Sequence, residues 1–359
     1  MMVTSLDRLR RDLKVTDRKI VRLLNERALL SVKIGKDKAK KGLDVFDASQ
    51  EAKLFAYLEQ VNEGMLPEEY LKAIFREIIS ASRALQKPVT VAFLGPHATF
   101  SHLAAQSYFG TSTSFVPQAT IFHVFDEVEK GRVQWGVVPV ENSLEGSVNL
   151  TLDQLMSSPL KIRAEIFLRI SHCLLAPGKR IDRIRRVYSV PQVLAQCQGW
   201  LRTNLPRCTF AESESTAAAA RSVGKDKDGA AIGSRLAAAT YGLNILSEAI
   251  EDNPSNTTRF LVMGEGETKM TGMDKTSVIF GTPHVPGALY HALEPFVERR
   301  INLMKIESYP LKKRLWEYLF FVDFSGHVGD PGIKKSMKAL RRKTNFLKIL
   351  GSYPRGEEP

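Results

Sequence analysis

The sequence has few cysteines and no long apolar run, and both absences narrow the class of protein. It contains three cysteines, Cys173, Cys197 and Cys208, which is an odd number without metal-ligand spacing. Reduced thiols in a cytoplasmic protein are the simplest interpretation. No apolar stretch approaches the roughly 18 residues that a membrane helix needs, and the charged N-terminal stretch lacks the apolar core of a signal peptide. We therefore expect a cytoplasmic protein without a membrane partner.

Several signatures of cofactor chemistry are also missing. The sequence has no Ser-His-Asp set, no Walker loop and no dinucleotide-binding fingerprint, so we predict no cofactor and no metal. The net charge is +12, but basic residues are interleaved with acidic ones everywhere except 334–348. This pattern does not favour nucleic acid as a partner, and it is compatible with small anionic substrates, which a positive field attracts.

Residues 1–87 read as an all-helical domain. Apolar residues recur at three- and four-residue spacing through the first helix: Leu6, Leu9, Leu13, Ile20, Leu23, Leu24, Leu30 and Ile34. Further helices are predicted over 47–61 and 68–85. Three amphipathic helices of this kind cannot bury their apolar faces alone, so we expect a homodimer or a larger assembly of identical chains.

The texture changes after Pro88, where strands and helices begin to alternate. The predicted strands are 89–94, 135–140, 162–176, 186–189 and 230–233, and the predicted helices are 101–109, 191–203 and 216–223. This alternation is typical of an α/β fold, and 88–270 is long enough for two lobes. Residues 275–359 give the order strand 276–281, helix 287–300, strands 302–309 and 317–324, helix 332–342 and strand 345–352. That βαββαβ order is the ferredoxin-like arrangement of an α+β domain.

The helical domain carries polar residues on matching faces. Arg27 and Lys38 are 11 positions apart, which places them on one face of the first helix and about 16 Å from each other. Asp47 and Glu51, and likewise Ser82 and Gln86, are spaced i,i+4. Solvated surface charge is the alternative interpretation for any one of them. In order and spacing, however, residues 5–87 resemble the all-helical chorismate mutase family.

This resemblance implies an intertwined dimer and a role for each polar residue. Arg10 would reach into the partner's site, and Arg27 would hold a substrate carboxylate. Lys38 and Gln86 would donate hydrogen bonds to the ether oxygen of chorismate, which gains charge in the transition state. Glu51, Asp47 and Ser82 would contact the hydroxyl and ring region. Gln50 stands where the family usually has an arginine.

Residues 91–263 resemble the prephenate dehydratase family through five stretches in the family's order: 93–101, 139–146, 188–197, 214–218 and 256–260. The family fold has two α/β lobes, like a periplasmic binding protein, with prephenate between them. By resemblance, Thr258 is the proton donor and Arg259 sets the electrostatics beside it, unless it is a structural ion-pair partner. The other implied substrate-binding residues are Thr99, Ser101, Glu141, Asn142, Ser189, Gln196 and Phe260. Helix capping is the alternative role for Thr99 and Ser101.

Residues 275–355 resemble the ACT domain, a module that binds amino acids. Two motifs carry this resemblance, Pro286-Gly-Ala-Leu289 and Glu307-Ser-Tyr-Pro310, in which Tyr309 replaces the usual arginine. The implied phenylalanine site consists of Gly287, Ala288, Leu289, Glu307, Ser308, Tyr309 and Pro310, with the ligand carboxylate at a helix N-terminus.

The combined prediction is a bifunctional enzyme of phenylalanine biosynthesis that converts chorismate to prephenate and then to phenylpyruvate. Two alternatives stay open. One is a dehydratase whose helical domain only dimerises, and the other is a non-catalytic sensor of metabolites.

Overall fold

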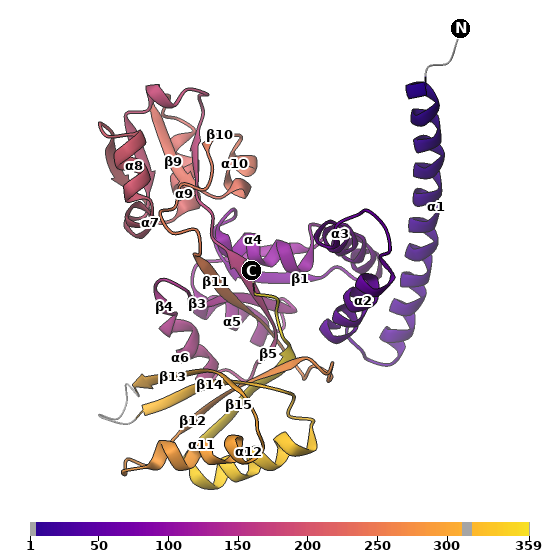
Figure 1. The fold of residues 1–359 in the computed structure, drawn as a ribbon, viewed down its shortest axis with the longest axis vertical. Helices are drawn as coiled ribbons and strands as arrows, with labels where there is room; N and C mark the ends of the chain where they lie inside the picture. The colour runs from indigo at the N-terminus through magenta and orange to yellow at the C-terminus, as the bar shows by residue number, and fades with distance from the viewer. Residues whose placement is uncertain (1–4, 311–317, 359) are drawn as a thin grey trace. The chain divides into compact units, whose positions relative to one another are not determined.

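The computed structural model describes residues 5–310 and 318–358, and its contacts form two compact units (Figure 1). The first consists of Met1–Asp47, Leu54–Val89 and Phe109–Ser114, and the second of Ala48–Lys53, Thr90–Tyr108 and Phe115–Pro359. In the described ranges, no helix has both the length and the apolar character required to cross a membrane.

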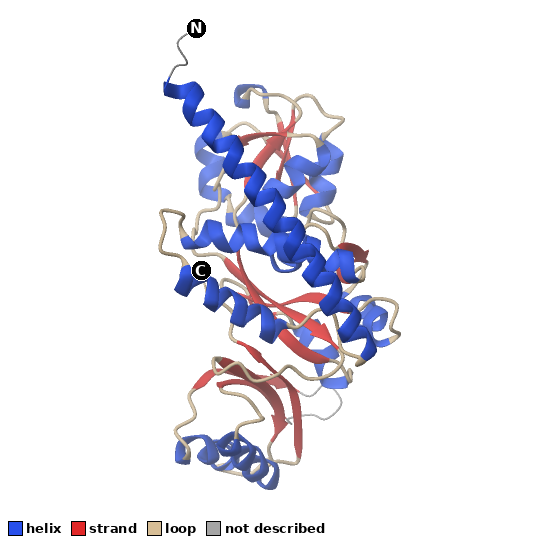
Figure 2. Ribbon diagram, turned by 90° about the vertical axis from the view of Figure 1, so that its right-hand side faces the viewer, coloured by secondary structure: helices blue, strands red, loops and turns tan. Residues whose placement is uncertain are grey.

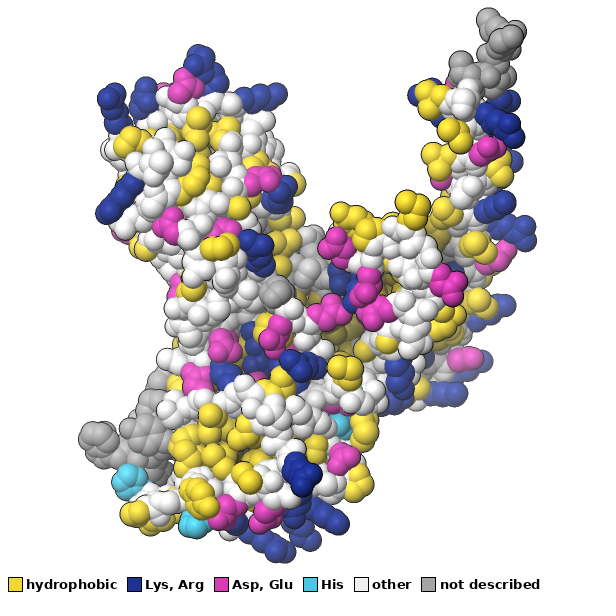
Figure 3. All heavy atoms as spheres, viewed as in Figure 1, with side chains coloured by type: hydrophobic (Ala, Val, Ile, Leu, Met, Phe, Trp, Pro, Cys, Tyr) yellow, Lys and Arg dark blue, Asp and Glu magenta, His cyan; other side chains and the backbone are white. Residues whose placement is uncertain are grey.

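Three helices make up the N-terminal segment, as predicted: α1 Ser5–Lys40, α2 Ala48–Val61 and α3 Glu68–Gln86. Helix α1 packs on α3 but has no buried residue in one chain. Its large apolar side chains are exposed along its length (Figure 3): Leu6, Leu9, Leu13, Val15, Ile20, Val21, Leu23, Leu24, Leu29, Leu30 and Ile34. This long apolar surface is what the periodicity of the sequence predicted.

The first α/β lobe is built on a mixed sheet in the order β2-β1-β3-β11-β5, with β4 paired to β3. Its strands are β1 Thr90–Leu94, β2 Ser114–Gln118, β3 Trp135–Asn142, β4 Gly146–Ser147, β5 Lys161–Arg169 and β11 Thr257–Gly264. Its helices are α4 Phe100–Phe109, α5 Ile121–Glu129 and α6 Asn149–Ser157. Strand β11 pairs antiparallel with both β3 and β5. The strand of this sheet that comes last in the sequence therefore lies inside the sheet and not at its edge.

The second lobe is an insertion between β5 and β11, with the sheet order β10-β6-β9-β7-β8. Its strands are β6 Cys173–Ala176, β7 Arg186–Ser189, β8 Thr209–Glu212, β9 Gly229–Gly233 and β10 Asn244–Ser247. Its helices are η1 Ile181–Arg183, α7 Pro191–Gln196, α8 Gln198–Asn204, α9 Thr216–Val223 and α10 Arg235–Tyr241. The two-lobed α/β architecture predicted for this part of the chain is present.

Two predicted elements are wrong in their extent. The strand predicted over 162–176 is two strands in different sheets, because the chain leaves the first lobe between β5 and β6. The helix predicted over 191–203 is also two, α7 and α8, because Cys197 lies between them with a non-helical ψ of 12°.

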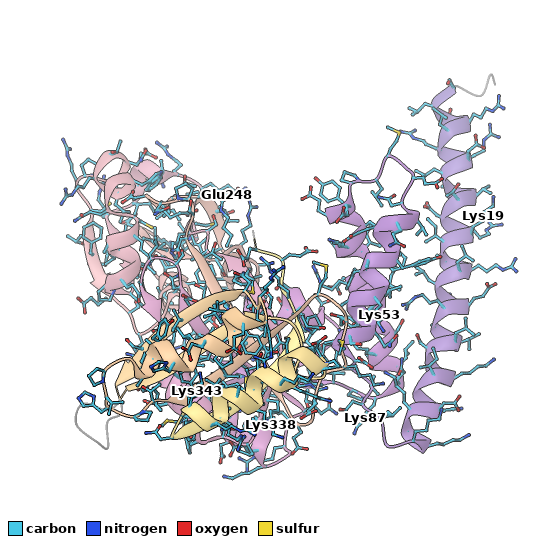
Figure 4. All side chains as sticks on the ribbon, turned by 60° about the horizontal axis from the view of Figure 1, so that its bottom comes forward. Lys19, Lys53, Lys87, Glu248, Lys338 and Lys343 are labelled. Carbon is cyan, nitrogen blue, oxygen red and sulfur yellow. The ribbon has the colours of Figure 1, made fainter. Side chains whose placement is uncertain are left out.

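The C-terminal part has the predicted βαββαβ order: β12 Asp274–Gly281, α11 Ala288–Glu298, β13 Leu303–Pro310, β14 Tyr318–Ser325, α12 Pro331–Lys343 and β15 Phe346–Pro354. The strand predicted from Glu317 begins outside the described residues. Both helices cover one face of the sheet, which has the order β13-β14-β12-β15 (Figures 1 and 2). Lys338 and Lys343 extend from α12 (Figure 4).

Side chains alternate across this C-terminal sheet, so both of its faces are buried. Val278 and Phe280 of β12 pack under α11 and α12. Ile279, between them in sequence, joins the core of the first lobe together with Leu152 and Leu155 of α6. The period-2 alternation of a strand therefore makes one sheet the shared wall of two cores.

Candidate functional site

In the helical segment, the structure brings Arg27 of α1 against Ser82 of α3. The Arg27 Nη1 donates to Ser82 Oγ at 2.7 Å, and that hydroxyl donates to the carbonyl of Ile78 at 2.7 Å. The serine is buried and the arginine half-buried. Two of the residues predicted from sequence therefore meet between α1 and α3, and Ser82 holds the guanidinium in place.

Lys38 and Gln86 lie further along the same pair of helices. Gly35, three residues before Lys38, makes room for Gln86, since a Cβ at Gly35 would come within 2.7 Å of Gln86 Cγ. The Gln86 carboxamide oxygen is buried and has no hydrogen-bond partner among the described residues. Lys38 Nζ donates to the Val45 carbonyl at 2.8 Å. The α1–α3 packing thus places Arg27, Ser82 and Gln86 along one line of contact, and Lys38 follows Gly35 on the same helix.

Three other residues were predicted for the helical site, Arg10, Asp47 and Glu51. Arg10 is exposed and lies 3.8 Å from Asp7 of its own helix. It precedes Arg27 by 17 residues, which is about 25 Å along a straight helix. Asp47 immediately precedes α2, and Glu51 lies in the first turn of α2. Their roles, like that of Arg10, stay predictions.

In the α/β part, four predicted or neighbouring residues form a closed ring of hydrogen bonds, in which one link is a backbone N–H. Asn142 Nδ2 donates to Asn256 Oδ1 at 2.7 Å, and Asn256 Nδ2 donates to Gln196 Oε1 at 3.3 Å. Gln196 Nε2 donates to Glu145 Oε1 at 2.7 Å, and the Glu145 backbone N–H returns to Asn142 Oδ1 at 3.2 Å. We call these four residues the amide ring. Because it joins β3 and α7, it connects the two lobes.

Thr258 is attached to the amide ring by a bond whose direction matters. Asn142 Oδ1 accepts from the backbone N–H groups of Leu144 and Glu145, so its Nδ2 must face Thr258. That Nδ2 donates to Thr258 Oγ1 at 2.9 Å. The threonine oxygen is thus an acceptor here, and its own proton stays available for another acceptor.

Three other predicted residues have different surroundings. Thr99 Oγ1 accepts from the His102 N–H and donates to the carbonyls of Leu94 and Pro96, so capping of α4, the alternative interpretation, is its observed role. Ser101 is buried in the first turn of α4. Ser189, at the end of β7, is fully buried and its hydroxyl has no partner among the described residues.

Glu141 and Arg259 lie opposite each other on β3 and β11, one residue away from the Asn142–Thr258 pair. Strand alternation therefore points them to the other face of the sheet. Lys305 of β13 pairs with Glu141 at 2.8 Å. Arg259 pairs with Glu165 at 2.8 Å and with Asp323 at 2.5 Å. The structure therefore joins these two residues to the C-terminal sheet rather than to the amide ring.

Arg259 belongs to a buried charged network. Its guanidinium also donates to Tyr353 Oη at 3.0 Å, and Lys275 pairs with Glu165 at 2.8 Å. Burial works against the charge of Arg259, but Tyr353, Asp323 and Glu165 more than offset it and raise its pKa. Two cations and two carboxylates balance one another here, which is how buried charges are tolerated. Phe260, the next predicted residue, is buried as well.

Comparison with known proteins decides the family. Residues 91–268 match the family described as prephenate dehydratase, and residues 9–87 match chorismate mutase type II. A bifunctional chorismate mutase/prephenate dehydratase of Aquifex aeolicus is 47% identical over 354 residues, covering 98% of each chain. The chain belongs to the bifunctional chorismate mutase/prephenate dehydratase family.

Two further proteins are similar to this chain, one along nearly its whole length and one along about three quarters of it. The bifunctional chorismate mutase/prephenate dehydratase of Escherichia coli K12 is 31% identical and covers 96% of this chain and 95% of its own. A crystal structure of prephenate dehydratase from Arthrobacter aurescens in complex with L-Phe is 36% identical with a TM-score of 0.69. It covers 74% of this chain and 90% of its own.

The two C-terminal motifs predicted to bind an effector occupy different elements. Gly287, with a φ of +78°, leads directly into α11, whose first residues are Ala288 and Leu289. Glu307, Ser308, Tyr309 and Pro310 end β13, and the side chain of Pro310 lies outside the described residues. Glu307 accepts from Ser147, and Tyr309 Oη donates to Asp153 at 2.5 Å. Both side chains therefore contact the dehydratase part.

Sequence analysis did not single out three residues that are hydrogen-bonded to Gln196: Asn256, Glu145 and His172. Asn256 stands two positions before Thr258, inside a stretch already assigned to the site, so its position in the motif could have indicated it. Glu145 likewise lies in a recognised stretch. No recognised stretch contains His172. It lies between β5 and β6, which the sequence analysis had predicted as one strand.

Proposed function

We propose that this chain rearranges chorismate to prephenate in its helical domain and converts prephenate to phenylpyruvate in its two-lobed domain. The main support for this proposal is that a bifunctional relative is 47% identical to this chain over 98% of its length. The geometry of Arg27 with Ser82, and of Thr258 with Asn142, supports separate sites for the two reactions.

For the mutase step, we assign charge stabilisation to the α1–α3 line. Rearrangement of chorismate breaks an ether bond and forms a carbon–carbon bond without a base or nucleophile. Arg27 holds a carboxylate, while Lys38 and the carboxamide of Gln86 donate to the ether oxygen as negative charge develops on it. Asp47, Glu51 and Ser82 contact the remainder of the substrate.

A second copy of the chain completes this site. The apolar residues of α1 are exposed in a single chain, and Arg10 lies about 25 Å from Arg27 along the helix. Antiparallel pairing of α1 with its copy would bury the apolar residues and deliver Arg10 to the partner's Arg27. We therefore propose a homodimer in which each mutase site takes Arg10 from the other chain.

For the dehydratase step, Thr258 donates its proton to the leaving ring hydroxyl. Water then departs as the ring carboxylate leaves as carbon dioxide, and the electrons of the broken carbon–carbon bond complete the aromatic ring. Asn142 supports this role because it donates to Thr258 Oγ1 and leaves the threonine proton free. Gln196 and Ser189 orient prephenate from the second lobe.

The C-terminal part is proposed to be an ACT domain that binds phenylalanine as a feedback inhibitor. Its βαββαβ order and the left-handed Gly287 before α11 support this proposal. Lys305 would link the effector motif to the amide ring through β3, since its ammonium lies 3.0 Å from Glu307 and 2.8 Å from Glu141, the residue before Asn142. Absence of binding heat with millimolar phenylalanine in calorimetry would remove the effector from this proposal.

The deciding experiment is incubation of the purified protein with chorismate, with prephenate and phenylpyruvate quantified over time. Phenylpyruvate should form with prephenate as its intermediate. The Thr258→Ala variant should stop at prephenate and lose dehydratase turnover by about 10²-fold or more, with mutase turnover unchanged. Conversion of prephenate without conversion of chorismate would favour the alternative of a helical domain that only dimerises.

A further inference from the structure

His172 is a buried histidine at the junction of the two lobes. It lies between β5 of the first sheet and β6 of the second, and only 1% of its surface is exposed. The chain returns to the first lobe through residues 248–256, and the two connections are bonded together. Ile170 N–H donates to the Asn256 carbonyl at 2.7 Å, and Ile250 N–H donates to the His172 carbonyl at 3.0 Å.

The imidazole of His172 contacts the amide ring. Its Nε2 lies 3.0 Å from Gln196 Oε1, the same oxygen that accepts from Asn256 Nδ2. Phe100 packs against the imidazole in a T-shaped arrangement, with ring centroids 5.3 Å apart. The backbone N–H of His172 donates to Glu251 Oε2 at 2.8 Å, which fixes where the residue stands.

The hydrogen bonds around Gln196 determine which atom donates. Glu145 presents a carboxylate oxygen to Gln196 Nε2 at 2.7 Å, and a carboxylate only accepts. The Gln196 oxygen must therefore face His172, so His172 Nε2 carries a proton and donates it. Burial lowers the pKa of His172, in agreement with a neutral ring whose single proton is on Nε2.

We propose that His172 is a positioning residue of the dehydratase reaction, which acts by donating from Nε2 to the carboxamide oxygen of Gln196. Without this donor, the Gln196 carboxamide loses one of the two bonds that hold its oxygen and is free to turn. Asn256 would then lose its acceptor, and Asn142, which holds Thr258, would lose the support of Asn256. The inference rests on the proposed roles of Thr258 and Gln196.

The test compares His172→Phe, which removes the donor, with His172→Gln, whose side-chain amide places a donor near the former Nε2. His172→Phe should lower dehydratase kcat by ~10- to 100-fold, because small displacements of reacting groups have effects of this size. His172→Gln should stay within about 3-fold of the parent. Equal losses in the two variants, or parental kcat in both, would overturn the proposal.

A matched control separates this effect from general damage. His327 is also buried, and its Nε2 bonds the carbonyl of Thr268 at 2.8 Å in the C-terminal part. His327→Phe should leave dehydratase kcat within about 3-fold of the parent, while a loss equal to that of His172→Phe would refute a specific role. The free energy of unfolding of each variant, measured by urea titration, reports whether the part of the chain that contains His172 and His327 is folded.

A double-mutant cycle tests the route through Gln196. If His172 acts by holding Gln196, then His172→Phe should have little further effect on kcat in a Gln196→Met background. Losses that multiply in the double variant would show that His172 acts elsewhere, and this also sinks the proposal. Parental activity in Thr258→Ala would instead defeat the proposed function, so the two failures are distinguishable.

Discussion

The helical segment differs from the rest of this chain in how much of its apolar surface a single copy buries. Helix α1 has 36 residues and none is buried, whereas β12 is buried at all eight of its positions. Burying an apolar side chain contributes about 1.5–3 kcal/mol, so α1 in a single chain leaves much stabilisation unused. The same contrast holds for chemistry, because Arg10 lies far from Arg27, while the amide ring closes within one chain.

Removing one charge from the buried network should cause the largest loss of stability, because the part of the chain that is well buried in a single copy depends on this network. Asp323→Asn leaves Arg259 and Lys275 facing only one carboxylate, Glu165. Breaking a buried pair from one side costs about 3–5 kcal/mol. We expect a loss of this size in the free energy of unfolding, measured by urea titration of the full chain.

Asp330→Asn provides the control for that experiment. Asp330 caps α12 by accepting from the N–H groups of Gly332 and Ile333. Asparagine caps helices about as well as aspartate, so this second Asp→Asn change in the same domain should be nearly neutral. An equal loss of unfolding free energy in both variants would mean that the buried network does not stabilise the fold more than a helix cap does.

Arg27→Ala sharpens the comparison from the helical side. Loss of one preorganised donor typically lowers kcat by about 10²–10³-fold, and we expect this for the mutase with dehydratase turnover unchanged. Arg22→Ala, in the same helix, removes an exposed arginine that pairs with Glu26 and should leave both activities intact. A parallel fall of both activities in Arg27→Ala would contradict separate sites.

A charge on the apolar surface of α1 tests whether a second copy covers it. Leu13 is 62% exposed in one chain, but Leu13→Glu should weaken pairing because a carboxylate would have to be desolvated. Mutase turnover should fall about 10-fold on dilution and recover at high protein concentration, with sedimentation showing dissociation. Lys14→Glu is the neighbouring control, and an unchanged assembly in Leu13→Glu would count against the dimer.

The smallest expected effect concerns the two helices of the C-terminal part. Glu294 of α11 accepts from Lys343 of α12, and this hydrogen bond lowers the pKa of Glu294 from its ordinary value. A depressed carboxyl pKa stabilises the fold above the unfolded value, and the contribution disappears as pH falls through the folded value. Thermal melts should show that Glu294→Gln is less stable than the parent at neutral pH, and that the difference shrinks as the pH is lowered into the acid range.

Glu298→Gln, one turn further along α11, is the exposed control for this measurement. It should follow the parent at every pH. If the difference between the parent and Glu294→Gln persisted undiminished in acid, the ion pair with Lys343 would not be its cause.

Periodicity predicted the elements that repeat one pattern for their whole length. The second and third N-terminal helices were predicted within a few residues of their observed ends, and so were the C-terminal elements wherever their ends lie among the described residues. Residues 162–176 misled the prediction because only residues 170–172, which include no Gly or Pro, separate β5 from β6, so nothing local marks the passage between the sheets at His172. Strand β11 was not predicted as a strand, since β3 and β5, its partners, are far away in sequence.

The candidate site was predictable where a motif and a geometry coincide. Thr258, Asn142 and Gln196 came from recognised stretches, and the structure joins them through Asn256. Glu141 and Arg259 came from the same stretches, yet they face the C-terminal sheet. A motif does not state on which side of its strand each residue points, and only the pairing of β11 with β3 reveals it.

The insertion of the second lobe also determines an order of events during synthesis. All five strands of its sheet lie between Cys173 and Ser247, so this lobe has its full set of strands before β11 leaves the ribosome. The first sheet cannot close until then, because β11 pairs with both β3 and β5. Domains fold as units when their residues are available. The inserted lobe is therefore expected to fold first, while β3 and β5 are still unpaired on the sides that β11 will later occupy.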